Sequence, residues 1–191
     1  MTRLHYLVAF LYVAFCAGLV RQATRPVTAE IQVTPAPTTE VTTGAQWFRR
    51  FKPFCNSVEV EVVYRGNPPP ATLDGQSYGA ACFALAGRID SARAIIDRLD
   101  QADRWRAAGV VFDVAHPIAD AGDDKSAGPI MTMVVDYWPT HYMALYHAGM
   151  ADYALGRRAT AKNLLERFLV EYHENDGWRS SAIRALEELK R

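Results

Sequence analysis

Histidine side chains are the first candidates for metal binding or catalysis in this chain of 191 residues. His141 and His147 are the nearest pair, and their separation along the sequence turns the two rings about 240° apart around a helix, so they do not share one ion. His173 lies beside acidic residues at the expected end of a helix, where no nucleophile motif accompanies it. We therefore expect no histidine-based metal site and no histidine-based catalytic centre.

Acidic residues and glycines form no recognised cofactor motif either. Three aspartates surround Gly122 (Asp120, Asp123 and Asp124), but the alternating oxygen ligands and the distal glutamate of a calcium loop are missing. Glycine-rich phosphate loops are also missing, and the three cysteines lack the spacing of zinc or haem motifs. The sequence therefore predicts a protein that is not an enzyme and that carries no cofactor and no metal.

Charge and composition limit the classes of partner. The chain has 21 Lys plus Arg and 21 Asp plus Glu, so it lacks the clustered positive charge that binding to nucleic-acid phosphates requires. Its 50% hydrophobic residues are enough to bury a core of ordinary size. We expect one globular domain with additional segments and no nucleic-acid partner.

Residues 1–25 are predicted to be a membrane anchor. Leu4–Val20 is an apolar run in which only His5 is polar, and arginines flank it on both sides. As a helix it is about 26 Å long, close to the thickness of about 30 Å of the hydrocarbon core of a bilayer. Two alternatives remain open, namely a secretory signal cleaved near Ala29 and a lipoprotein modified at Cys16.

Residues 26–44 are rich in Thr and Pro and are predicted to be an extended linker. A linker after one N-terminal span suits a domain, residues 45–191, that stands on the periplasmic side of a bacterial inner membrane. Such an oxidising compartment permits a disulfide between Cys55 and Cys82. The alternative is two buried free thiols.

An internal repeat predicts the fold of residues 45–191. Residues 84–99 align without gaps onto residues 153–168, with Gly87 on Gly156. Gly122 lies almost midway between these two glycines, which divides the distance into two nearly equal units. Pro139 follows where the second helix of the middle unit should end. The spacing predicts three helix-turn-helix units with glycine in the turns.

This pattern resembles the tetratricopeptide repeat (TPR), a helix-turn-helix unit of about 34 residues. The last unit carries the family positions best, with Leu145, Gly149, Ala151, Tyr153, Gly156, Ala161 and Leu165. The resemblance implies an all-α, TPR-like solenoid of antiparallel helix hairpins, with about three to four repeats, after an N-terminal transmembrane helix. We also expect flanking helices at Ala45–Phe54, at Val58–Arg65, where alternating valines also suit a strand, and at Gly177–Lys190.

The resemblance implies a binding groove on the inner face of the solenoid. The residues of this chain that match the groove positions of the family are Phe112, His116, Met143, Tyr146, Met150 and Tyr153, with Asp120 beside them. Such an apolar and aromatic groove suits a helix or an apolar loop of a partner rather than a C-terminal carboxylate. The alternative is that these side chains pack against the N-terminal helix of the chain itself.

A second candidate surface follows the linker. It combines aromatic rings with positive charge in Trp47, Phe48, Arg49, Arg50 and Lys52. This mixture suits lipid headgroups or an acidic partner, and the alternative is a helix that caps the first repeat.

Together these patterns favour a non-enzymatic, membrane-anchored accessory or scaffold subunit. We expect it to mediate protein-protein contacts within a larger bacterial inner-membrane complex, with a photosynthetic or respiratory electron-transfer complex as the first candidate. The alternative is a soluble or lipidated periplasmic adaptor that binds peptides or envelope machinery.

Overall fold

Helices account for the regular structure of residues 42–191, the part of the chain that the computed structural model describes. Several helices begin at a side chain that accepts a bond from the first exposed backbone N–H groups, as Thr43, Thr72 and Asp176 do. The helices are α2 (Gly44–Phe51), α3 (Val60–Gly66), α4 (Leu73–Leu85), α5 (Ile89–Asp97), α6 (Arg104–Asp120), α7 (Asp124–Tyr137), α8 (Tyr142–Ala154), α9 (Arg158–Glu171) and α10 (Gly177–Leu189), with short 3-10 turns at Lys52–Phe54 and Gln101–Asp103. The predicted all-α class is therefore confirmed for these residues.

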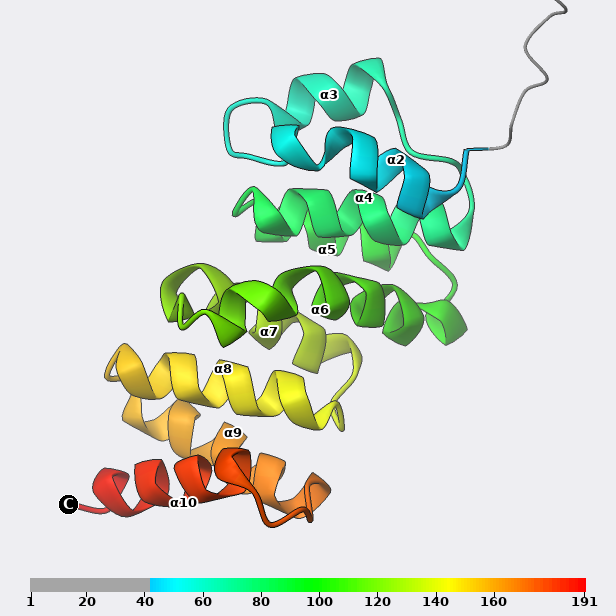
Figure 1. Ribbon diagram of the computed structural model, residues 1–191. Helices are drawn as coiled ribbons and strands as arrows, with labels where there is room; N and C mark the ends of the chain where they lie inside the picture. Colours follow the sequence, from blue (N-terminus) through cyan, green and yellow to red (C-terminus); the bar gives the residue numbers. More distant parts are fainter. Residues whose placement is uncertain (1–41) are drawn as a thin grey trace, which may run out of the picture. The chain divides into compact units, whose positions relative to one another are not determined.

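The helices from α4 to α9 form three hairpins, α4 with α5, α6 with α7, and α8 with α9. In Figure 1 the first helices of the hairpins, α4, α6 and α8, run one below another, and α10 follows at the C-terminal end. The helices α2 and α3 lie at the opposite end, where α2 packs on α4. Residues from all three hairpins and from both ends contribute to one continuous apolar core.

Glycine makes the turn inside each hairpin. Gly87, Gly122 and Gly156 have φ angles of 72°, 79° and 74°, a left-handed conformation that costs glycine little. In each turn the residue after the glycine donates its N–H to the carbonyl five residues before it, as Arg157 does to Asp152 at 2.8 Å. The predicted turn glycines are confirmed, at nearly equal intervals along the chain.

Small residues allow the paired helices to approach closely. An added Cβ at Gly149 would lie 2.8 Å from Leu165 of α9, so a larger residue there would force α8 and α9 apart. The alanines that the repeat places on the second helices are all buried, namely Ala92, Ala127 and Ala161. These positions stabilise packing and are not chemical groups.

The flanking helices occur where the sequence predicts them. The segment Ala45–Phe54 forms α2 and the 3-10 turn after it, and Gly177–Lys190 forms α10. The ambiguous segment Val58–Arg65 is a turn followed by helix α3 from Val60 onward, so the strand alternative is wrong.

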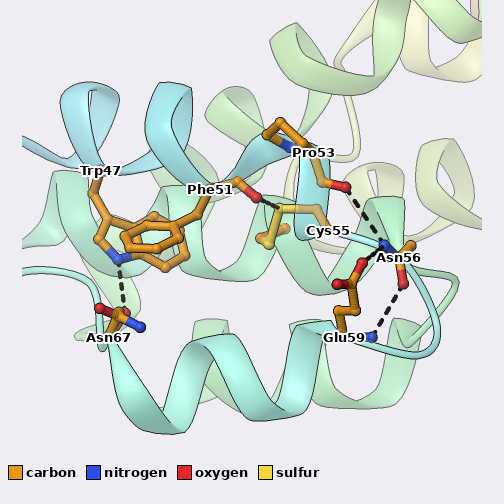
Figure 2. The surroundings of a disulfide bond; sticks show 8 residues. Trp47, Phe51, Pro53, Cys55, Asn56, Glu59 and Asn67 are labelled. Carbon is orange, nitrogen blue, oxygen red and sulfur yellow. Dashed lines mark hydrogen bonds between the residues drawn. A yellow bond between two sulfur atoms is a disulfide. The ribbon is translucent and has the colours of Figure 1, made fainter.

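A disulfide attaches the loop before α3 to α4. Cys55 and Cys82, 27 residues apart in sequence, are bonded to each other, as Figure 2 shows. Nearby, the indole N–H of Trp47 donates to the backbone carbonyl of Asn67 at 2.8 Å, which connects α2 to the end of α3. The disulfide therefore holds the segment between α2 and α3 against α4, and the Trp47 bond joins α2 to α3.

The predicted anchor at residues 1–25, its alternatives at Ala29 and Cys16, and nearly all of the linker lie outside the described residues. From residue 42 onward, the structure contains no helix that combines the length and the apolar character needed to cross a membrane.

Candidate functional site

A cleft opens between the first helices of the second and third hairpins, α6 and α8. Its volume is about 510 Å³. Helix α6 lines one side and the residues around the start of α8 line the other, so the wall includes Phe112, Asp113, His116, Trp138, His141, Tyr142 and Met143. This volume lies within the range of ligand-binding pockets in proteins, about 300–1,000 Å³.

Aromatic packing holds the walls of the cleft in place. His141 caps the start of α8 by accepting the Ala144 N–H on its Nδ1 at 3.2 Å, and the centre of its ring lies 4.1 Å from that of Phe112. Trp138 packs edge-on against His141, with ring centres 4.6 Å apart. On α6 an added Cβ at Gly109 would be 3.4 Å from the Trp138 ring, so a glycine at this position allows the indole to lie against the helix.

His141 and Asp113 are two of the titratable groups that line this cleft. Burial is the main cause that lowers the pKa of His141, and it outweighs the opposing effect of the Asp113 carboxylate. His141 is therefore neutral near pH 7. Asp113 is exposed, and within the described part of the chain it makes no ion pair and no side-chain hydrogen bond. The cleft thus presents aromatic rings and one unpaired negative charge.

The structure divides the predicted groove in two. Phe112, His116 and Met143 line the cleft. Tyr146 does not, because it is buried between Phe168 of α9 and Trp178 of α10, with ring centres 5.1 and 5.0 Å away.

Helix α10 also occupies the far end of the predicted groove. The Tyr153 hydroxyl donates to the Glu188 carboxylate of α10, and Met150 is partly buried against the core. The second half of the groove is therefore packed within the chain, but against the C-terminal helix α10 and not against the N-terminal helix that the alternative named.

The second candidate surface is also divided. Trp47 and Phe48 are 4% and 6% exposed, and Phe48 stacks on Tyr78 of α4 at 5.2 Å between ring centres. Only the positive side chains Arg49, Arg50 and Lys52 face solvent. The two rings are not available to lipid, because Tyr64 of α3 packs against Trp47 and Tyr78 of α4 packs against Phe48. Helix α2 therefore caps the first hairpin and presents charge alone.

A cluster of two histidines and one aspartate lies further along the same pair of helices. His116 and Asp120 come from α6, and His147 comes from α8. Asp120 Oδ1 lies 3.4 Å from His116 Nε2 and 3.5 Å from His147 Nε2. Both Nε2 atoms are shielded from solvent and make no hydrogen bond, since the contacts to Asp120 are long and poorly aligned.

Burial determines the charge of His147 in this cluster. His147 is 5% exposed, and its burial, followed by the neighbouring His116, lowers its pKa to about 4 although Asp120 acts in the opposite direction. The ring is therefore a neutral imidazole at pH 7. A neutral imidazole with a shielded, unpaired nitrogen is the form in which histidine binds a metal ion.

This cluster was not predicted from the sequence, because only His141 and His147, the histidines nearest each other along the chain, were considered as a pair of ligands. His116 and Asp120 are one helical turn apart and share a face of α6, and His147 follows His116 by close to one repeat length. These two spacings could have predicted the cluster, because residues about one repeat length apart lie close together on the first helices of neighbouring hairpins.

No family model, no curated protein and no solved structure matches this chain.

Proposed function

We propose that this chain is a non-enzymatic, TPR-like scaffold subunit that binds a segment of a partner protein in the cleft between α6 and α8. The observation that carries the proposal is the unpaired Asp113 carboxylate in an aromatic cleft. The occupant that fits is a lysine or arginine side chain presented by a helix or loop of the partner.

The chemistry of the cleft supports a basic side chain. Aromatic faces attract cations, and the rings of Trp138, Phe112 and Tyr142 surround the site. A cation bound there would also pair with Asp113, while its aliphatic stem would cover the rings from water. A purely apolar segment would leave Asp113 without a counter-charge.

The repeat architecture supports a TPR-like solenoid. Three left-handed glycine turns recur at nearly equal intervals along the chain, and a buried alanine follows each turn on the second helix. Solenoids of this kind use the face formed by their first helices as an extended binding surface. The cleft lies between two such helices, α6 and α8.

The cellular setting is part of the same proposal. Residues 1–25 anchor the chain in a bacterial inner membrane, residues 26–44 form a linker, and the repeat domain stands in the periplasm. The disulfide between Cys55 and Cys82 supports an oxidising compartment. The partner is another subunit of a membrane complex, and photosynthetic and respiratory electron-transfer complexes are the first to test.

A site-specific cross-linking experiment tests the proposal. A photoreactive phenylalanine analogue replaces Tyr142, which lines the cleft and is 45% exposed, and the full chain is irradiated in its own membranes and purified in mild detergent. Val170 on α9, 68% exposed, receives the same analogue as a control. We expect one cross-linked subunit with the first variant and none with the second.

Reversing the charge of Asp113 then tests whether the cross-linked partner is bound in the cleft. Asp113→Lys should reduce the cross-linked fraction at least about tenfold, because it places like charges opposite each other. Glu187→Lys, the same charge change at an exposed site on α10, should leave it unchanged. Equal cross-linking at positions 142 and 170, or a cross-link that survives Asp113→Lys, would contradict docking in the cleft.

The intact mass of the purified chain tests the anchor, since a chain that begins near Glu30 and migrates alone would favour the periplasmic adaptor.

A further inference from the structure

The histidine-aspartate cluster between α6 and α8 suggests a second function, which is independent of the proposed docking of a partner in the cleft. We propose that His116, Asp120 and His147 bind one divalent transition-metal ion of the zinc class, with the Nε2 atoms of both histidines and a carboxylate oxygen as ligands.

The separations between the ligand atoms fit such an ion. Bonds of about 2.0 to 2.1 Å in tetrahedral geometry place two ligand atoms about 3.3 Å apart. The two contacts of Asp120 Oδ1, at 3.4 Å to His116 Nε2 and 3.5 Å to His147 Nε2, are already near this value. All three atoms lie within 4.8 Å of one another, so a small movement of the His116 ring completes the site.

The buried nitrogens point to a ligand. His116 Nε2 and His147 Nε2 are both inaccessible to solvent and without a hydrogen-bond partner, and only 5% of the His147 side chain is exposed. A buried polar atom without a partner is destabilising, so two of them within 3.5 Å of one carboxylate oxygen indicate a common occupant. A metal ion bound between them would satisfy both.

The donor set selects the class of ion. Two imidazoles and one carboxylate suit zinc and its first-row neighbours, whereas calcium and magnesium prefer oxygen ligands alone. Asp120 is partly exposed, with 44% of its side chain accessible, so the ion can enter from that side and a water molecule can complete the coordination. Three protein ligands with one open position are typical of a zinc site that exchanges its fourth ligand.

The structural elements hold the ligands in position before the ion binds. His116 and Asp120 are one helical turn apart on α6, and the His116 ring stacks on Phe112 at 4.6 Å between centres. The His147 ring is packed against Tyr146 and Trp178. Because packing restricts the rings, little conformational entropy is lost when the ion is bound.

Metal titration of the full chain tests the proposal. Protein without a histidine tag is freed of metal with a chelator, and ZnCl₂ is added during isothermal titration calorimetry, while CoCl₂ is followed by visible absorption. We expect one ion per chain, cobalt bands of a four-coordinate site, and a thermal midpoint raised by about 5 °C or more at saturating zinc.

Conservative substitutions assign the ligands. Asp120→Asn and His116→Gln should each weaken zinc binding at least about tenfold. His173→Gln removes an exposed histidine outside the cluster and should leave the affinity unchanged. Far-UV circular dichroism confirms that each variant is folded, and Asp120→Asn is the safest variant because its side chain keeps its shape at a partly exposed position.

Three results would overturn the proposal. They are a full chain that binds no stoichiometric zinc, zinc binding that survives both Asp120→Asn and His116→Gln, and zinc binding that is lost in His173→Gln. In the first case a buried water molecule, which can donate to both Nε2 atoms, is the occupant of the cluster.

Discussion

Replacing the turn glycine Gly156 by alanine tests the repeat geometry on which the cleft depends. The φ angle of Gly156 is 74°, and an added Cβ would meet no heavy atom within 4 Å, so the effect of alanine there is confined to the backbone. Alanine in the left-handed region costs about 1–2 kcal/mol. It regains about 0.4–1 kcal/mol by restricting the unfolded chain. We expect Gly156→Ala to lower the free energy of unfolding by about 0.5–1 kcal/mol.

Gly66 provides the matched control. It is the last residue of α3, an added Cβ also meets nothing within 4 Å, and its φ angle is not positive. Gly66→Ala should therefore raise the free energy of unfolding by about 0.4–1 kcal/mol, so the two variants should differ by about 1–2 kcal/mol. Urea unfolding of the full chain in detergent measures the difference as a change in midpoint at constant slope. If Gly156→Ala is as stable as Gly66→Ala, the left-handed turn is not what the glycine provides.

The remaining predictions concern the core, the disulfide and pH. Removing the disulfide with Cys55→Ala and Cys82→Ala together should lower the free energy of unfolding by about 3.5 kcal/mol, the loop-closure value for a separation of 27 residues, and an unchanged urea midpoint would contradict this. Phe168→Ala should cost about 3–5 kcal/mol because the ring is fully buried, and a loss below about 1 kcal/mol in the same assay would mean that the ring is not part of the core. The low pKa of His147, about 4 in the folded chain against 6.5 when unfolded, makes the unfolded state bind more protons between these values. In the presence of a chelator, stability should therefore be independent of this group above pH 6.5 and fall by about 2–3 kcal/mol as the pH drops to 4, and His147→Gln should remove that slope.

The repeat was predictable because its determinants are local. A left-handed turn requires glycine at one position, and close helix packing requires a small residue a few positions later, so both leave a period in the sequence. Gly87, Gly122 and Gly156 occupy the turns that this period predicts. The same locality explains why the helix at Gly177–Lys190 could be located from its apolar face.

The open part of the groove was not predictable, because it depends on how a later helix docks. Tyr146 and Phe112 are equally plausible groove residues by repeat position. Tyr146 is covered because α10 brings Trp178 against it, in addition to Phe168 of α9. Likewise, the rings of α2 were predicted beside the charges of Arg49 and Arg50, but nothing local indicates that α4 covers Phe48 while leaving those charges in solvent.

The cleft and the histidine-aspartate cluster both arise where α6 meets α8, and they share His116. The ring of His116 lines the cleft and also directs its Nε2 toward Asp120, so a metal ion would hold one wall of the docking site in a single orientation. Asp120 and His147 do not line the cleft, and Asp113 is not a ligand. Asp120→Asn should therefore weaken metal binding without changing the residues that line the cleft, whereas Asp113→Lys changes the cleft without changing a metal ligand. Partner binding is measured for Asp120→Asn and for the wild-type chain, with and without zinc. If the variant binds the partner more weakly than the wild type only when zinc is present, the ion organises the docking site, because the residues that line the cleft are the same in both proteins.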